Sequence, residues 1–142
     1  MSQENVDVVH QIAAALGPRD LDLFLKVTDP AVEWHASISV ISEGGAYHGH
    51  KGIRQYVLDI DDTFEVLEAT LDRVLDVGDL VLAVGRLHYR GKASGVEQDA
   101  EMGWVFRFRG GKVIYLRAFR DPERTLATVG LTDEARSPAA SL

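Results

Sequence analysis

The stretch that decides the fold is Val96–Asp121, VEQDAEMGWVFRFRGGKVIYLRAFRD. Before the turn, alternate positions are mostly apolar on one side and mostly charged on the other. The first side carries Val96, Gln98, Ala100, Met102, Trp104, Phe106 and Phe108. This period of two predicts a strand with one buried face. Arg109–Gly111 then provides a turn, and the β-branched and aromatic residues after it predict a second strand, so the stretch forms a long antiparallel hairpin.

The turn of this hairpin leaves two registers open. A two-residue turn at Gly110-Gly111 sets Trp104 opposite Arg117, whereas a three-residue loop with a left-handed Gly111 sets Trp104 opposite Leu116. We favour the three-residue loop, because a slip of one residue moves every side chain to the other face, and only this register gives a continuous apolar surface. Helices must cover the aromatic residues of that surface. The space between sheet and helices is therefore where we expect a ligand.

Length and composition limit the class of protein. We expect one domain over residues 1–131 and a flexible tail over 132–142, out of 142 residues in all. The sequence has no cysteine, which excludes disulfides, thiolate nucleophiles and Cys-ligated metals. Its net charge of −7 argues against nucleic acid or an anionic membrane as a partner. We expect no secretory signal and no membrane span, hence a cytoplasmic protein.

Apolar spacing predicts the remaining elements. A first helix over 6–16 ends at Gly17-Pro18, with Gly17 as a left-handed cap, and Asp20 caps a second helix that stops before Pro30. A glycine-rich loop over 38–52 precedes a third helix that starts at Ile53. Further strands are predicted at 31–36, at 67–77 with the odd positions buried, and at 80–90, and a short helix after Asp121-Pro122 ends at Gly130.

This order of elements predicts an α+β fold: a cone-shaped, curved antiparallel sheet with the three helices of the N-terminal half packed on its concave face. Four short motifs accompany it, YHGHKGI at 47–53, ASG at 93–95, FRFRGGKV at 106–113 and RDPE at 120–123. Together they resemble the SnoaL-like family of the nuclear transport factor two-like superfamily, which includes relatives of ketosteroid isomerase and limonene epoxide hydrolase. The resemblance covers nearly the whole chain up to the tail, and its motifs specify the fold more than the activity.

Three polar residues are candidates for catalysis. Arg86 and His88 follow the apolar side chains of Leu80, Leu82 and Val84 along one strand face, so we expect that face to enter the pocket. Arg86-Leu87-His88 resembles the Arg-x-Asp strand of limonene epoxide hydrolase, with His in place of Asp. Asp121 matches the second acidic residue of that family and an acid/base aspartate of SnoaL-type cyclases.

The roles that we expect for this trio depend on convergence in one cavity. His88 would move a proton, Asp121 would orient it or activate water, and Arg86 would stabilise negative charge. The structural alternatives are a solvated strand end for Arg86 and His88, and a helix N-cap for Asp121.

The apolar candidates for ligand binding start from two tryptophans. By resemblance, Trp34 and Trp104 replace the general base and the oxyanion-hole aspartate of ketosteroid isomerase, so steroid isomerisation by that machinery is not expected. Two indole walls suit a flat, apolar ligand. The expected binding residues are Trp34, Tyr56, Met102, Trp104, Phe106 and Leu116.

Several other features favour structural roles. His48-Gly49-His50 invites a metal site, but no third ligand has an obvious spacing, and we expect neither metal nor cofactor. Glu97, Asp99 and Glu101 alternate with apolar residues and indicate a solvated or subunit-facing surface. Gly103 among them predicts the close approach of another backbone.

An interface between copies of the chain is also expected. The predicted outer face of the last two strands mixes apolar and charged side chains, namely Val105, Tyr115 and Phe119 with Glu101, Arg107 and Arg117. Proteins that the chain resembles commonly pair through this sheet, so a homodimer is expected.

Two functions remain open. The first is a cofactor-independent acid/base isomerase, cyclase, lyase or hydrolase acting on a polyketide-, terpenoid- or aromatic-type molecule. The second is a non-catalytic module of the same fold that binds a ligand or a protein.

Overall fold

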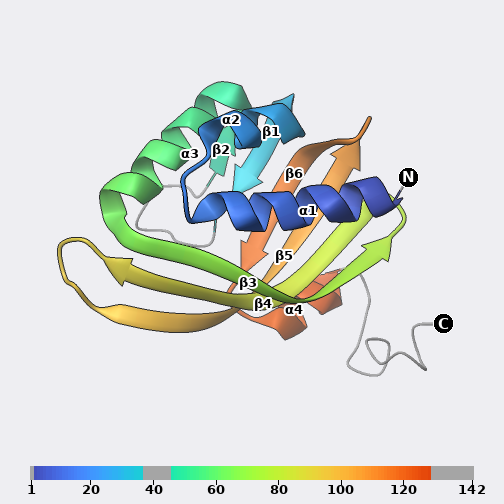
Figure 1. Cartoon of the computed structure of the whole chain (residues 1–142). Coiled ribbons are helices and arrows are strands. Elements are labelled where there is room, and N and C mark those ends of the chain that lie inside the picture. Colours follow the sequence, from blue (N-terminus) through green and yellow to red (C-terminus); the bar gives the residue numbers. More distant parts are fainter. Residues whose placement is uncertain (1, 37–45, 129–142) are drawn as a thin grey trace.

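The computed structural model describes residues 2–36 and 46–128 (Figure 1). The elements are α1 (Ser2–Leu16), α2 (Leu21–Val27), β1 (Thr28–His35), β2 (Ala46–His48), α3 (Gly49–Thr63), β3 (Phe64–Val77), β4 (Leu80–Gly91), β5 (Glu97–Arg109), β6 (Lys112–Phe119) and α4 (Pro122–Thr128). The predicted tail at 132–142 and the predicted end of the last helix at Gly130 lie outside the described residues. No helix in the described part is long and apolar enough to cross a membrane.

The strands form a single sheet in the order β2-β1-β6-β5-β4-β3, and this sheet is not closed. Helices α1, α2 and α3 cover its concave face, as predicted, and α4 packs on the opposite face (Figure 1). The sheet is antiparallel as predicted except at one pair, since β1 pairs with β6 in parallel. Parallel neighbours need no direct turn between them, so nothing local in the sequence predicts this pair.

The β5–β6 hairpin combines a two-residue turn with a β-bulge. Gly110 and Gly111 form a two-residue turn with φ of 60° and 82°. The pairing then shifts by one residue beyond Phe108, which leaves Trp104 opposite Ala118 and Phe106 opposite Leu116. Both predicted registers are therefore wrong in detail. The requirement behind them holds, since the extra residue in β6 restores a continuous apolar inner face.

A second irregularity reverses the far half of β3. The register with β4 shifts between Leu71 and Arg73, so Val74 packs on the main core and Leu75 packs on the other face of the sheet. The sequence predicted that the odd positions of this strand share one buried face. They do not. The strands come very close here, because a Cβ at Gly85 would collide with the carbonyl oxygen of Thr70.

The glycine-rich segment before α3 is more ordered than predicted. Residues 46–48 form the short strand β2, with Tyr47 opposite Trp34, and α3 begins at Gly49 instead of Ile53. A Cβ at Gly52 would lie 2.9 Å from the backbone of Tyr47. The glycine therefore permits close packing of helix on strand and does not mark a loop. Residues 37–45 of the predicted loop lie outside the described residues.

The two faces of the sheet carry separate cores. The main core lies between the sheet and the helices α1–α3 and includes Trp34, which is only 2% exposed. The smaller core on the opposite face contains Leu82, Val105 and Phe119. On that face α4 rests against Gly103, where an added Cβ would collide with Thr125. A close approach at Gly103 was predicted, but the Thr125 side chain makes it and not a backbone.

Arg19 connects the end of α1 to the start of β3. The predicted cap residue Gly17 is not left-handed, and Arg19 adopts the positive φ of 58° instead. Its guanidinium donates to the carbonyl oxygens of Leu16 (2.9 Å), Gly17 (2.8 Å) and Phe64 (3.1 Å). These bonds satisfy carbonyl groups at the helix end, and they fix α1 over the inner face of the sheet.

Candidate functional site

The six residues expected to bind a ligand lie around two adjacent cavities beneath the helices. The larger cavity, of about 50 Å³, is lined by Val9, Ile12, Ala13, Leu16, Phe24, Trp34, Tyr56, Ala69, Leu71, Trp104, Phe106 and Leu116. The smaller one, of about 40 Å³, is lined by Leu16, Trp34, Ala36, Tyr56, Leu67, Leu87, Met102, Trp104, Leu116 and Ala118. Trp34, Tyr56, Trp104 and Leu116 contact both. The two cavities are therefore neighbouring parts of one apolar space.

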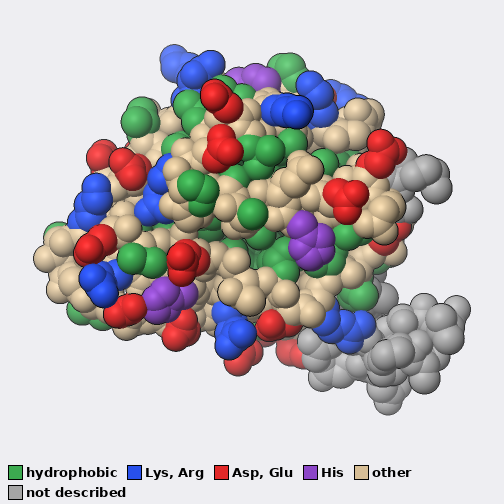
Figure 2. All heavy atoms as spheres, viewed as in Figure 1, with side chains coloured by type: hydrophobic (Ala, Val, Ile, Leu, Met, Phe, Trp, Pro, Cys, Tyr) green, Lys and Arg blue, Asp and Glu red, His purple; other side chains and the backbone are tan. Residues whose placement is uncertain are grey.

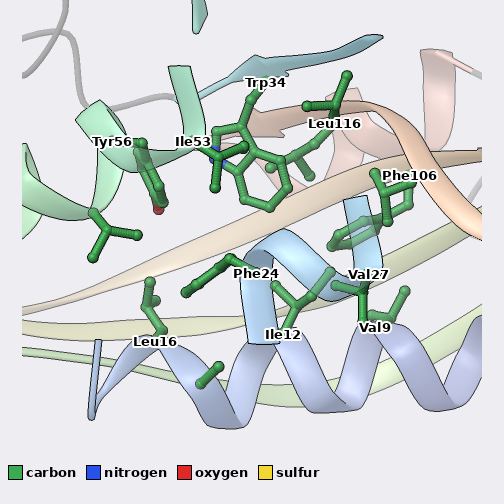
Figure 3. Packing of buried hydrophobic residues seen from close by; sticks show 14 of the residues in the cluster. Val9, Ile12, Leu16, Phe24, Val27, Trp34, Ile53, Tyr56, Phe106 and Leu116 are labelled. Atoms are coloured by element: carbon green, nitrogen blue, oxygen red, sulfur yellow. The ribbon is translucent and has the colours of Figure 1, made fainter. Parts of the chain in front are cut away.

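Aromatic contacts hold Trp34 at the top of this space (Figure 3). The ring of Phe24 meets it edge-on, with centroids 5.9 Å apart and an interplanar angle of 84°. Tyr56 lies beside it at 5.5 Å, and Tyr47 contacts Tyr56 at 5.4 Å. Edge-to-face geometry is favoured by the ring quadrupoles, and together with burial it restricts the indole to one position.

Trp34 and Tyr56 each bring one polar side-chain atom to this mainly apolar lining. The indole Nε1–H of Trp34 is buried and has no hydrogen-bond acceptor among the described residues. It lies close enough to the Tyr56 hydroxyl to oppose the rise in pKa of that group, as the charge of Arg19 also does, although the two groups do not meet the strict geometry of a hydrogen bond. Burial dominates and raises the pKa of Tyr56 to about 12. The phenol is therefore protonated at neutral pH and acts as a donor.

The cavities are small compared with usual ligand pockets. One water takes roughly 30 Å³ of liquid volume, and sites for drug-sized ligands occupy roughly 300–1,000 Å³. A ligand larger than a few heavy atoms must therefore displace side chains. Trp104 is the natural residue to move, since it is only half-buried and contacts both cavities.

Arg86 and His88 do not face this space, which corrects the expectation of a shared pocket. The residues of β4 that point to the helices are Ala83 and Leu87, whereas Leu82 belongs to the small core on the other face. Arg86 and His88 follow Leu82 in the alternation and lie on that outer face. The mistake arose because β4 is covered on both faces near its start, so its apolar stripe does not identify the pocket side.

His88 is held between two carboxylates near the end of β4. Its Nδ1 lies 2.8 Å from Asp99 Oδ1, and its Nε2 lies 2.8 Å from Glu97 Oε2. The hydrogen bond to Asp99 contributes most to a raised pKa of His88, and Glu97 adds to it. Glu97 and Asp99 thus lie on a solvated face, as predicted, and partner a histidine there.

Arg86 and Asp121 line one shallow depression on the outer face, together with Asp72, Arg73, Val84, Gly85, Glu101, Pro122 and Glu123. The lining does not include His88, so the structure brings together two of the three catalytic candidates. Arg86 is largely exposed and lies 3.8 Å from the Asp72 carboxylate. Asp121 accepts the backbone N–H of Glu123 at 2.9 Å, which is a capping role at the start of α4.

The histidines of the 48–50 segment also separate. His50 Nε2 lies 2.8 Å from the carbonyl oxygen of Thr28, which ties α3 to β1. His48 is on the exposed side of β2, opposite Glu33. In the part of the chain that the structure describes, no group of three or more His, Cys, Asp or Glu side chains is placed to hold a metal ion.

Some lining residues were not identified as such from the sequence. Val9, Ile12 and Leu16 of α1 form the cavity floor, and Phe24 of α2 forms an edge of it. Their helical spacing indicated a buried stripe but not a cavity. That distinction depends on how closely α1 approaches the sheet, which Arg19 helps to set.

The comparisons with known proteins agree with this fold. A family model described as a SnoaL-like domain matches residues 9–116. A comparison with curated protein sequences finds no match. Among solved structures, an NTF2-like protein of unknown function from Burkholderia pseudomallei has 20% identity and a TM-score of 0.74, over 89% of this chain and 98% of the other.

Two further structures share the fold at similar identity. TerC, co-crystallised with polyporic acid, has 21% identity and a TM-score of 0.73, over 90% of this chain and 97% of its own. A proposed SnoaL-like polyketide cyclase from Jannaschia sp. has 20% identity and a TM-score of 0.69, over 83% and 85%. The family match spans most of the sequence and the architecture is that of the NTF2-like α+β cone, so this chain belongs to the SnoaL-like domain family.

Proposed function

We propose that this protein binds a small, mainly apolar molecule between the sheet and helices α1–α3. The observation that carries this proposal is the convergence of six side chains from β1, α3, β5 and β6 on one apolar space. That space also holds the unpartnered indole N–H of Trp34. A core built only for stability would be filled and would leave no buried donor without an acceptor.

The ligand class that fits is a polyketide-, terpenoid- or aromatic-type molecule. Apolar and aromatic side chains form the whole lining, and both indole rings are among them. A protein of the same fold has been crystallised with polyporic acid, and another is a proposed polyketide cyclase, which supports the same general class.

Binding without catalysis is the function that the geometry favours. The acid/base trio of Arg86, His88 and Asp121 lies on the other face of the sheet from the cavities. Among the described lining residues, Tyr56 is the one titratable group, and a pKa of about 12 makes it a hydrogen-bond donor and no base at neutral pH. An isomerase, cyclase, lyase or hydrolase would need its base from elsewhere.

We also propose a homodimer that pairs through the outer face of β1 and β6. Tyr115 lies half-buried there beside His35, with ring centroids 5.3 Å apart. It lines a shallow depression with Ala31, Glu33, Arg107 and Ile114. Val105 and Phe119, also expected at this interface, are already buried in the small core, so the proposed contact lies nearer to β1.

The experiment for ligand binding fills the cavity without touching its polar atoms. Ala69 lines the larger cavity, and Ala69→Leu places a larger side chain in existing space. We expect the variant to fold, with a change in the free energy of unfolding of at most about 1–3 kcal/mol. It should lose the rise in melting temperature that hits from a library of small apolar metabolites give the wild type.

The matched control makes the same substitution on the surface. Ala127 is exposed on α4, on the opposite side of the sheet, so Ala127→Leu should keep every ligand-induced shift. A wild-type protein that no apolar compound stabilises, or an Ala69→Leu variant that responds as the control does, would contradict binding in this cavity.

A further inference from the structure

The indole nitrogen of Trp34 is unusual among the buried polar atoms. Two buried side-chain nitrogen or oxygen atoms in the described residues have no hydrogen-bond partner, Arg19 Nε and Trp34 Nε1. Arg19 Nε lies 3.7 Å from the Asp61 carboxylate, so its charge is compensated. Trp34 Nε1 has no carboxylate beside it, and its polar neighbour is the Tyr56 hydroxyl, without hydrogen-bond geometry. A buried donor left without an acceptor is destabilising, and this one lies in the wall of a cavity.

A second donor lies beside it. The nitrogen edge of the Trp34 ring is on the side of Tyr56 in Figure 3, and both side chains line both cavities. An indole N–H can only donate, whereas a phenol can both donate and accept. Two adjacent donors that converge on one space match an oxygen atom with two lone pairs.

The charge of that oxygen follows from the lining. Neither cavity has a lysine, arginine or histidine among its lining residues. Arg19, whose charge acts on Tyr56, lines neither cavity and is already held by three carbonyl oxygens and the Asp61 carboxylate. A carboxylate or phosphate bound in the cavity would therefore lose its hydration without gaining a free counter-charge, which is strongly unfavourable. A neutral carbonyl oxygen has a much smaller desolvation cost and accepts from both donors. Apolar walls from Phe24, Trp104 and Leu116 would contact the rest of the molecule.

We propose that the ligand of this cavity carries an uncharged carbonyl oxygen, which accepts hydrogen bonds from Trp34 Nε1–H and the Tyr56 hydroxyl, on a ring-sized apolar body. The proposal rests on the proposed function, that the cavity binds a small apolar molecule. It narrows that class to neutral ketones, quinones and related carbonyl compounds, and it excludes plain hydrocarbons and anions as preferred ligands.

The test compares two probes of similar shape, cyclohexanone and methylenecyclohexane. The carbonyl oxygen of the first is replaced by a CH₂ group in the second. Affinities of both are measured by NMR titration of the wild type, Trp34→Phe and Tyr56→Phe. Loss of one hydrogen bond should lower the ratio of ketone to alkene affinity about 3- to 10-fold in either variant. The alkene alone should bind each variant nearly as well as the wild type.

A control and a direct readout accompany the affinities. Tyr115→Phe makes the same change on the outer face and should keep the wild-type ratio. In the wild type, the indole N–H signal that Trp34→Phe removes should move downfield with cyclohexanone and not with methylenecyclohexane. This readout is made on the wild type, and Trp34→Phe serves only to assign the signal. Tyr56→Phe tests the second donor independently.

The outcomes separate this inference from the proposed function. If both probes bind, but the ratio is unchanged in both variants and the indole signal responds equally to the two, the cavity binds apolar molecules and the carbonyl assignment is wrong. If neither probe binds the wild type, the proposed function fails for ring-sized molecules and the present inference fails with it.

Discussion

His88 shows how a residue on a solvated strand can still have a defined electrostatic environment. Asp99 and Glu97 each approach one ring nitrogen to 2.8 Å, so both nitrogens can donate only when the ring is an imidazolium. This arrangement raises the pKa of His88, with Asp99 as the largest contributor. The side chain is 36% exposed, so solvent screens the effect on stability.

The first prediction at this scale concerns titration. Because the folded-state pKa of His88 is raised above 6.5, its stabilising contribution is present below pH 6.5 and is lost as the pH rises through the raised value. Asp99→Asn should move the midpoint of His88 back towards its ordinary value, as measured by NMR of the ring protons between about pH 5 and about pH 8. Asp79→Asn, at an exposed turn, is the matched control. A His88 midpoint that Asp99→Asn does not lower would refute the ion pair.

The cavity residues were predictable because each followed from a face that had to be buried. Met102, Trp104 and Phe106 share the apolar side of β5. Leu116 lies on the same face in the predicted register and in the observed one, because the two differ by two residues. The direction of Arg86 and His88 was not predictable in this way. The apolar residues before them occur on both sides of β4, and α4 covers the outer one, which only the folded chain reveals.

At the scale of elements, the helices and long strands follow from the sequence, and the irregularities do not. The period of two and the period near 3.6 identify α1, α2, β3, β4, β5 and β6 within a few residues. The bulges in β3 and β6 each insert one residue, and a single residue carries no periodic signal. The short strand β2 has only three residues, so the same reasoning applies.

The bulges matter for the site because they set its walls. In β6 the extra residue brings Leu116 and Ala118 opposite Phe106 and Trp104, on the cavity side. In β3 the reversal keeps Leu71 on the cavity and sends Leu75 to the outer core. A bulge increases the local twist of a strand, so these two bulges help to curve the sheet around the space that α1 covers.

At the scale of the whole molecule, surface charge gives little guidance to partners. Acidic and basic side chains are interspersed over the visible face, with hydrophobic side chains between them (Figure 2). The net charge is −7, but that face shows no large patch of a single charge sign. Charge on this face therefore does not indicate a partner.

The prediction for assembly is a dimer of twice the 15.6 kDa chain mass in light scattering at micromolar concentration. Tyr115→Asp introduces a charge into the proposed contact and should give a monomer. Leu58→Asp introduces the same charge on α3, where Leu58 is 60% exposed, and should leave the dimer intact. A monomeric wild type, or equal masses for the two variants, would exclude pairing through this face.

The central claim is that the ligand site lies under the helices and not in the outer depression. A methyl NMR map of the wild type with cyclohexanone tests it directly, because both faces of the sheet carry methyl groups. We predict that the signals of Ile12, Leu16 and Leu116, which line the cavities, shift on titration, while those of Leu75 and Leu82 in the outer core do not. Shifts confined to the outer set, or to Val84 in the depression beside Arg86 and Asp121, would contradict the account.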